Sequence, residues 1–549
     1  MNEFAIPAVS KPSTAVVSRR NIVTQVVVAI FFSTMVFYCV VNAGSVNLRS
    51  VQLFHNQLDN TYPEGAHVFS AIRAAQTGSL YFSFREPPYI VQSYGPLFYL
   101  FSALIARFAH LSVEYTTLAM RGVSYACYLG CALLVLLICR KLRCSWLWSG
   151  LAALMMLGQH DFLGWNITVR PDMLMLLAMV LSLFFSLCMD EHPWLFVALS
   201  GLAAGLAFLI KSPGAGVAVS IVLVLAVRKE FRRIFLFSAA AASPVVGMFL
   251  GLLLHRESFW GQFTSLGKAY WSWREGLRFI SLAVVDVTYI VPASIGLLGF
   301  VIAIRKGKSW QFIASFLLVN GLLGLSGLPQ PGSNANYYLP GLVGCSLLLP
   351  LAAEFFQKPP ALRLATLVFA SALLYATYLG AWHDIGYLCY FNGPDHFSYA
   401  PLRKFQMLTD LPLLSMKGHD PDLLDSYAIH SLELTGQWDS TPVIDEIRDR
   451  KFDLVILTRV KPKAVFTPHP KAYSAVPNWR GISYFSPEEV SALNDNYDFL
   501  CSSIFSVVLK PKHRSVDISA DYFDPLFKSP CRTEIANYPA NLALADGTR

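Results

Sequence analysis

Apolar runs separated by short polar segments fill the chain from Asn21 to Trp382. A helix needs about 20 mainly apolar residues to cross the hydrocarbon core of a bilayer, and most of these runs approach that length. The pattern therefore predicts a polytopic α-helical membrane protein with about eleven transmembrane helices. The expected spans are residues 22–41, 123–139, 146–163, 173–189, 194–210, 214–227, 234–254, 279–304, 310–328, 337–355 and 364–382.

Basic residues give the expected orientation, because lysine and arginine gather in the cytoplasmic loops of membrane proteins. The basic clusters are Arg19 with Arg20, residues 140–143, 228–233 and 305–308, and Lys358 with Arg363. Placing all of them on one side assigns residues 1–20 to the cytoplasm and the carboxyl-terminal region to the outside. This alternation requires that the apolar segment 94–111 does not cross the bilayer. Residues 46–117 are therefore expected to form one large outer loop with helices in the interface.

The composition turns to that of a soluble domain after residue 382. The segment "IDEIRDRKFDLVILT" predicts a helix followed by a buried strand at residues 452–457. In "SPEEVSALNDNYDF", Ser486 and Glu489 have the spacing of a helix capping box, and "FLCSSIFSVVLK" predicts a further strand. Residues 383–549 are therefore expected to form an extracytoplasmic α/β domain, in which Cys501 and Cys531 are candidates for a disulfide.

The overall composition supports a membrane protein. Hydrophobic residues make up 54% of the chain and charged residues 14%, which excludes an ordinary soluble protein. The formal net charge of +8 comes from basic residues that lie between apolar runs. Membrane topology accounts for this charge, so no nucleic-acid partner is predicted.

Polar side chains that could act in catalysis or binding lie at the expected outer ends of the spans. They are Asp59, Glu64 and Arg85 in the first outer loop, His160, Asp161, Arg170 and Asp172 around the second, Lys211 at the end of a span, Arg274 in a later loop, and Asn336 with Tyr337. An ionisable group at a membrane edge is costly unless it faces water or a partner, so their shared location predicts a functional site.

These residue types suggest transfer of a sugar from a phosphate. A carboxylate can take the proton of an acceptor hydroxyl, and lysine or arginine can neutralise the departing phosphate. Structural interpretations also exist: Glu64 suits the start of a helix, Lys211 can extend toward lipid headgroups, and Arg170 can simply pair with Asp172.

Four segments carry a family resemblance. After the acidic loop come "REPPYIVQSYGPLFYL", "VRPDMLMLLAMVLS", "GLAAGLAFLIKSPG" and "NANYYLP". Their order resembles the bacterial GT-C membrane glycosyltransferases, relatives of the protein O-mannosyltransferases and of the aminoarabinose transferase of lipid A. The resemblance covers roughly residues 21–382. It implies a GT-C-like transmembrane domain in the bacterial inner membrane. It also implies inverting transfer of a sugar from a polyprenyl-phosphate donor to a lipid, glycan or protein acceptor outside the cytoplasm.

The resemblance also implies roles for individual residues. Family members commonly have adjacent Asp-Glu in the first outer loop, whereas this chain has Pro63-Glu64 with Asp59 five residues earlier, so either Asp59 or Glu64 is the expected catalytic base. The donor phosphate is expected at Arg170, Lys211 and Arg85. The remaining candidates for substrate binding are Asp172, His160, Asp161, Arg274, Asn336 and Tyr337.

The sequence is compatible with more than one cofactor assignment and more than one functional class. No cofactor is firmly predicted, and a divalent metal held by His160, Asp161 and Asp59 is a secondary alternative, because one histidine beside one aspartate is a weak signal. The main rival function is a secondary transporter or lipid flippase whose carboxylates couple to ions. Transporters more often bind near the midplane between repeated halves, and no repeat is evident here. A non-catalytic assembly or receptor protein acting through its carboxyl-terminal domain is a further alternative.

Overall fold

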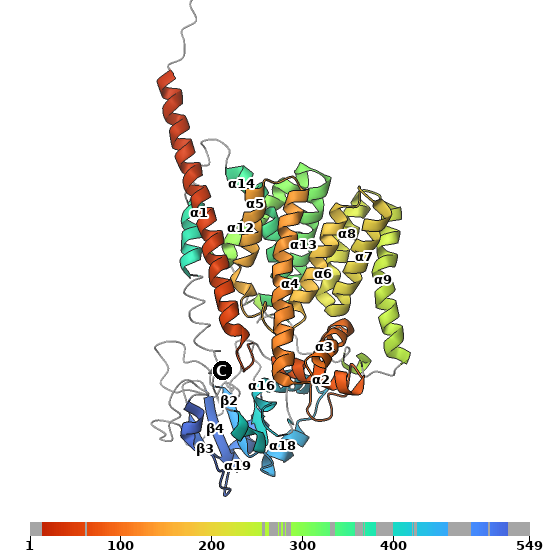
Figure 1. The fold of residues 1–549 in the computed structure, drawn as a ribbon, viewed down its shortest axis with the longest axis vertical. Helices are drawn as coiled ribbons and strands as arrows, with labels where there is room; N and C mark the ends of the chain where they lie inside the picture. The colour runs from red at the N-terminus through yellow and green to blue at the C-terminus, as the bar shows by residue number, and fades with distance from the viewer. Residues whose placement is uncertain are drawn as a thin grey trace, which may run out of the picture.

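The computed structural model describes residues 14–60, 63–254, 259–262, 273, 276–277, 280, 287–329, 335–356, 366, 368–379, 399–419, 421, 425–458, 485–502 and 506–524. A helical bundle forms the amino-terminal part, and a small domain with a four-stranded sheet forms the carboxyl-terminal part (Figure 1). Two short helices, α2 (Glu64–Thr77) and α3 (Pro96–Phe108), lie between them.

The bundle contains an apolar helix in each of the eleven predicted spans. Its helices are α1 (Thr14–Phe54), α4 (Val113–Lys141), α5 (Trp146–Leu157), α6 (Asp172–Leu187), α7 (Pro193–Ile210), α8 (Ala215–Val227), α9 (Phe231–Leu254), α12 (Val287–Lys306), α13 (Lys308–Gly327), α14 (Leu339–Phe356) and Val368–Leu379. Six of them, namely α1, α4, α7, α9, α12 and α13, are long and apolar enough to cross a membrane. The prediction of a polytopic α-helical membrane protein is confirmed, while the exact number of crossings stays a prediction.

Helix α1 continues to Phe54, beyond residue 46 where the outer loop was expected to begin. The extra turns carry polar side chains that are buried and hydrogen-bonded. Ser50 Oγ donates to the Val46 carbonyl at 2.8 Å and accepts from Asn166 Nδ2 at 2.7 Å. Hydropathy did not reveal this extension, because these polar residues face the protein.

Helix α3 has 13 residues, which is shorter than the span of about 20 residues that crosses a bilayer but no shorter than α5 or α8. It packs against α2 and α4 at one end of the bundle (Figure 1). One face of the helix, which includes Phe98 and Tyr99, packs on protein, whereas Leu104 and Phe108 on the other face are exposed. A helix with one apolar face exposed at the end of the bundle agrees with the expectation that this segment lies in the interface.

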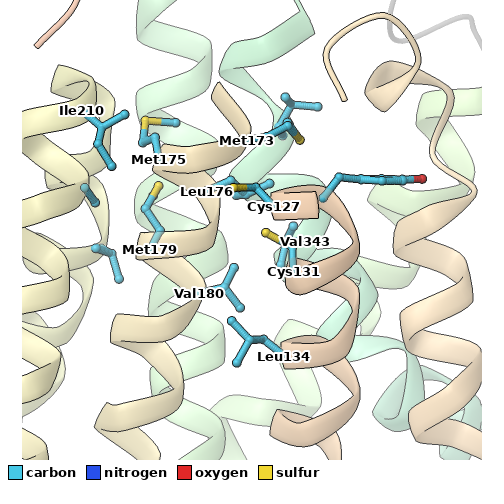
Figure 2. Packing of buried hydrophobic residues seen from close by; sticks show 14 of the residues in the cluster. Cys127, Cys131, Leu134, Met173, Met175, Leu176, Met179, Val180, Ile210 and Val343 are labelled. Carbon is cyan, nitrogen blue, oxygen red and sulfur yellow. The ribbon is translucent and has the colours of Figure 1, made fainter. Parts of the chain in front are cut away.

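The core between α4 and α6 fixes the helix ends that carry polar candidates. Buried side chains from α4 and α6 interdigitate there, joined by Ile210 of α7 and Val343 of α14 (Figure 2). The labelled residues of the first two helices are Cys127, Cys131 and Leu134 of α4 and Met173, Met175, Leu176, Met179 and Val180 of α6. Met173 follows Asp172 and Ile210 precedes Lys211, so this packing places both charged residues.

Several residues of the basic loops form ion pairs at one end of the bundle. Arg233 contacts Asp190 at 3.0 Å, Lys141 pairs with Glu191, and Lys306 pairs with Glu354. Arg228 also donates a hydrogen bond to the Lys308 carbonyl. The basic segments 140–143, 228–233 and 305–308 therefore lie at the same end of the bundle, as predicted. The carboxyl-terminal domain lies toward the opposite end of the bundle (Figure 1).

The carboxyl-terminal domain has strand order β1-β2-β4-β3. Its elements are β1 (Met407–Thr409), α16 (Pro412–Ser415), α17 (Ser426–Glu433), α18 (Thr441–Arg448), β2 (Leu454–Thr458), α19 (Pro487–Asn496), β3 (Tyr497–Ser502) and β4 (Ser506–Pro511). The predicted helix-strand pair corresponds to α18 and β2. The capping box is confirmed, because Ser486 Oγ accepts from the Glu489 N–H while the Glu489 carboxylate accepts from the Ser486 N–H.

The prediction of one strand in "FLCSSIFSVVLK" is wrong. The segment contributes to two antiparallel strands, β3 and β4, with Phe499 opposite Leu509. The run contains no glycine or proline to mark the reversal, so its pattern resembled one continuous strand. Cys501 is buried and disulfide-bonded, whereas its predicted partner, Cys531, lies outside the described residues.

The domain is attached to the segment between α2 and α3. Tyr89 packs edge-on against Trp438 with ring centroids 4.8 Å apart, and the Val91 N–H donates to Asp425 Oδ2 at 3.3 Å. Phe84, Tyr89 and Val91 belong to the hydrophobic core of the domain. The outer loop and the domain therefore share one core.

Candidate active site

Glu64, the first residue of α2, has both carboxylate oxygens fully engaged. Arg121 donates from Nε to Oε1 at 2.8 Å and from Nη2 to Oε2 at 2.7 Å. Two backbone N–H groups complete the set: Val169 donates to Oε1 and Asn60 to Oε2, each at 2.8 Å. We call Asn60, Glu64, Arg121 and Val169 the Glu64 cluster. Since a carboxylate offers about four acceptor sites, none is left for a substrate.

Sequence reasoning missed Arg121, which is completely buried in α4. Besides Glu64, it donates to the carbonyls of Phe54 at 3.2 Å and Leu58 at 2.9 Å, and to that of Asn56. It therefore ties together the segment that follows α1. The available signal was a lone arginine in the otherwise uncharged stretch "TTLAMRGVSYACYLG", just before the predicted span.

Asp59 is buried at the contact between α2 and the carboxyl-terminal domain. Its Oδ1 accepts from the Gly65 N–H at 2.7 Å and its Oδ2 from the Leu413 N–H at 2.8 Å. Burial and then the nearby Glu64 raise the pKa of Asp59 to about 7, although these hydrogen bonds and Arg121 favour the charged form. Gly65 permits the close approach, because a Cβ there would lie 2.4 Å from the Leu413 nitrogen.

A second group of charges forms where α6 begins and α7 ends. Lys211 Nζ donates to Asp172 Oδ1 at 2.6 Å, and Asn336 Nδ2 donates to the same oxygen at 3.0 Å. The other oxygen, Asp172 Oδ2, is buried and has no hydrogen-bond partner within the described residues. We call Tyr94, Arg170, Asp172, Lys211 and Asn336 the Lys211 cluster.

Aromatic rings surround the two cations of the Lys211 cluster. Lys211 Nζ lies 5.3 Å from the ring centroid of Tyr94 and 5.2 Å from that of Tyr337. Arg170 Cζ lies 4.6 Å from the ring centroid of Trp165 and 6.0 Å from that of Tyr94. These are cation–π distances. Tyr94 therefore faces both cations, and Arg170 Nε is buried without a partner in the described part of the chain.

Gly95 sets the position of Tyr94. Its N–H donates to the Ile210 carbonyl at 3.0 Å, and a Cβ at this position would lie 2.0 Å from the Leu209 oxygen. The loop before α3 therefore contacts the end of α7 directly, beside Lys211, and glycine is required for this approach.

A small cavity of about 10 Å³, enough for about one water molecule, lies between α3, α4 and the start of α6, and Arg170 is part of its lining. Its lining is mostly apolar: Phe98, Phe101, Ser102, Ile105, Met120, Val123, Ser124, Val169, Arg170 and Leu174. The serine hydroxyls are used internally, since Ser102 donates to Phe98 O and Ser124 to Thr168 O. Arg170 supplies the charge of this lining.

The Glu64 cluster positions the Lys211 cluster through residues 168–170. Glu64 accepts a hydrogen bond from the Val169 N–H, and Ser124 donates one to the Thr168 carbonyl. The backbone that leads to Arg170 is therefore fixed from two sides. Glu64 therefore lies in one cluster and Arg170, Asp172 and Lys211 in another, connected by the backbone at Val169. Asp59 lies next to the Glu64 cluster, with its own partners Gly65 and Leu413.

The other predicted residues have different surroundings. Asp161 Oδ1 accepts from Tyr289 OH at 2.6 Å, and the short helix His160–Phe162 contacts the helix Ala335–Tyr337 that carries Asn336. Arg85 is exposed, with Cζ 5.8 Å from the ring centroid of Phe84, and no described contact joins it to the Lys211 cluster. Arg274 lies outside the described residues.

The metal alternative gains no support from the described part of the chain. No three His, Cys, Asp or Glu side chains gather there in an arrangement that could hold a metal ion. His160, Asp161 and Asp59 thus do not form such a group.

Comparisons with known proteins show the fold. No protein-family model matches the chain, and no curated protein matches it in sequence. The apo structure of ArnT from Cupriavidus metallidurans matches with a TM-score of 0.52 at 14% identity, over 86% of this chain and 97% of ArnT. ArnT bound to undecaprenyl phosphate matches with a TM-score of 0.50 at 12% identity, over 84% of this chain and 97% of ArnT. The chain therefore has the fold of ArnT, with a polytopic helical domain followed by a carboxyl-terminal domain, as the resemblance found in the sequence implied.

Proposed function

We propose that this protein transfers a sugar from a polyprenyl-phosphate donor to an acceptor hydroxyl. The observation that carries the proposal is Arg170, a cation in the lining of a small and mostly apolar cavity, beside a second cation, Lys211. This arrangement suits an amphiphilic anion, with an apolar chain against α3 and α4 and a phosphate at the two cations. ArnT, which shares the fold, has been solved with undecaprenyl phosphate.

The Lys211 cluster has donors available for a phosphate. Arg170 Nε has no partner among the described residues, and a lysine ammonium has three donors, of which Asp172 takes one. Hydrogen bonds from a cation to a phosphate oxygen are among the stronger ones in proteins. Arg85 is a less suitable phosphate ligand, since it is exposed and stacked on Phe84.

The expectation that Asp59 or Glu64 is the base stays a prediction, and the contacts favour a third carboxylate, Asp172. Glu64 is saturated by four donors, and Asp59 is engaged by two backbone groups of α2 and α16. Asp172 instead has one oxygen, Oδ2, without a hydrogen-bond partner among the described residues, and its other oxygen accepts from Lys211. A phosphate that attracts Lys211 also loosens its hold on Asp172 Oδ1, which leaves this carboxylate more basic.

The proposed step is an in-line displacement at the anomeric carbon. The acceptor oxygen forms a bond to that carbon while the bond from the carbon to the phosphate oxygen breaks, and its electron pair stays on the phosphate. The acceptor proton passes to Asp172 Oδ2. Arg170 and Lys211 stabilise the additional negative charge of the departing phosphate. Attack opposite the leaving group inverts the anomeric configuration.

We place this reaction outside the cytoplasm, in the inner membrane of a bacterium. The basic loops lie at the end of the bundle distant from the carboxyl-terminal domain, and basic loops are typically cytoplasmic. The site and the domain then face outward, where a lipid, glycan or protein hydroxyl is the acceptor. The transferred sugar is a hexose or pentose.

The test is sugar transfer in membranes supplied with radiolabelled polyprenyl-phosphate monosaccharides and an acceptor-containing extract. We expect transfer by the unchanged protein and by Asp190→Asn, an exposed carboxylate at the other end of the bundle, and none by Asp172→Asn. Retained transfer in Asp172→Asn with loss in Asp59→Asn or Glu64→Gln would move the base to the Glu64 region. If the unchanged protein consumes no donor but moves it across the membrane, the transporter interpretation replaces this one.

A further inference from the structure

His67 is a buried histidine of α2 that sequence reasoning did not single out. Its side chain is 1% exposed, and neither ring nitrogen has a hydrogen-bond partner within the described residues. Leaving a buried polar group unpaired is unfavourable, and such groups in native proteins usually have a protein, water or ligand partner. The free ring nitrogens of His67 therefore suggest a ligand.

The imidazole contacts one aromatic residue of the Lys211 cluster, Tyr94, and one of the cavity lining, Phe98. Its ring centroid lies 4.9 Å from that of Tyr94 and 5.9 Å from that of Phe98. Tyr94 is the ring that also faces Arg170 and Lys211, and Phe98 lines the cavity together with Arg170. His67, Arg170 and Lys211 thus surround the same tyrosine.

The surrounding charge favours an anion. Burial, then Arg170 and Lys211, lower the pKa of His67 well below its usual range, so the free ring is neutral. From α4, the charge of Arg121 is already matched by Glu64, and Asp172 is paired with Lys211. A neutral imidazole keeps one N–H donor, which can bind an anion without adding a third positive charge beside Arg170 and Lys211.

We propose that His67 is a third ligand of the phosphate site, donating a ring N–H to a phosphate oxygen of a polyprenyl phosphate held by Arg170 and Lys211. This inference rests on the phosphate site of the proposed function, but it concerns binding and does not require transfer. A phosphate monoester carries more negative charge near neutral pH than the diester of the sugar donor, since its second pKa is about 6. His67 is therefore expected to contribute more to binding the lipid phosphate that remains after transfer.

The experiment measures binding of undecaprenyl phosphate to the full-length protein in nanodiscs, with undecaprenol and inorganic phosphate as separate probes. His67→Phe keeps a ring against Tyr94 and Phe98 but removes both nitrogens, and His67→Gln restores one donor. His192→Asn, an exposed histidine at the start of α7, is the matched control. Lys211→Met tests the phosphate site while His67 is unchanged.

We expect His67→Phe to weaken binding of undecaprenyl phosphate about tenfold or more, as for loss of a hydrogen bond to a charged group. Binding of undecaprenol should not change, and His67→Gln should recover part of the loss. Equal affinity of His67→Phe, His67→Gln and the unchanged protein, with weaker binding by Lys211→Met, would overturn the role of His67 alone. The phosphate site itself is wrong if the unchanged protein binds undecaprenyl phosphate no more tightly than undecaprenol and does not bind inorganic phosphate. The donor site of the proposed function is then wrong as well.

Discussion

Glu64 and Arg121 form a bidentate ion pair in which neither side chain is exposed to solvent. The pair joins the start of α2 to α4, and Arg121 also holds the carbonyls that follow α1. A proton on Glu64 would remove an acceptor from Arg121 or from a backbone N–H. The ion pair therefore stabilises the segment between α1 and α2. Transfer of a proton from a substrate to Glu64 would weaken this ion pair.

The first prediction concerns the stability supplied by this pair. Glu64→Gln leaves Arg121 charged, buried and without its partner, which typically costs about 3–5 kcal/mol. We expect a clearly lower midpoint of thermal unfolding in detergent. Glu191→Gln, which removes an exposed partner of Lys141, should change stability by about 1 kcal/mol or less. The double variant Glu64→Gln with Arg121→Met should recover part of the loss.

A normal unfolding midpoint for Glu64→Gln, combined with complete loss of sugar transfer, would contradict this prediction. It would show that Glu64 acts on the substrate, as the family resemblance implied.

The second prediction concerns pH and Asp59. Burial and the neighbouring Glu64 raise the pKa of Asp59 from 3.8 to about 7. The folded protein then binds this proton more tightly than the unfolded chain, so the stability that Asp59 contributes is present in acid and is lost as pH rises from about 4 to about 7. Asp59→Asn has no such proton. Between about pH 5 and pH 8, the unfolding midpoint of the unchanged protein should therefore fall relative to that of Asp59→Asn.

Asp517→Asn provides the control for this pH series, because Asp517 is exposed in the carboxyl-terminal domain. Its midpoint should follow that of the unchanged protein at every pH. A difference between Asp59→Asn and the unchanged protein that stays constant with pH would mean that Asp59 is charged throughout the range.

The third prediction concerns the contact between Gly95 and the end of α7. In Gly95→Ala, the added Cβ would lie 2.0 Å from the Leu209 oxygen, so the loop that carries Tyr94 has to move. Overpacking of this kind typically costs about 1–3 kcal/mol, and displacement of Tyr94 from Arg170 and Lys211 should also reduce sugar transfer. Gly44→Ala is the control, since nothing lies within 4 Å of its added Cβ and alanine is favoured in a helix. Full activity of Gly95→Ala would show that the loop can adapt.

The apolar runs predicted the helices well because crossing a bilayer imposes a length and composition that local sequence displays. Each predicted span contains an apolar helix, and the capping box at Ser486 was visible because both its residues lie within four positions. The strand reversal between β3 and β4 was missed, since no turn residue marks it.

The site was harder to predict because its residues meet across long distances in sequence. Glu64 and Arg121 are 57 residues apart, and Asp172 and Asn336 are 164 apart. Sequence reasoning selected Arg170, Asp172, Lys211 and Asn336 by their location at span ends, and the structure brings these four together. It could not separate Asp59 and Glu64 from this group, because only the fold shows which partners each carboxylate has. His67 carried no signal, as a histidine within an ordinary helix.

The last prediction separates the structural and chemical roles of Lys211. Lys211→Met removes the cation that pairs with the buried Asp172 carboxylate, so an uncompensated charge remains and we expect a loss of about 3–5 kcal/mol in the free energy of unfolding. Asp172→Asn in the same chain removes that charge, so the double variant should unfold close to the midpoint of the unchanged protein. Sugar transfer should remain absent, because the departing phosphate lacks Lys211 and the acceptor lacks its base. Recovery of transfer together with stability in the double variant would show that this pair only supports the fold, whereas recovered stability without transfer would assign it to the reaction.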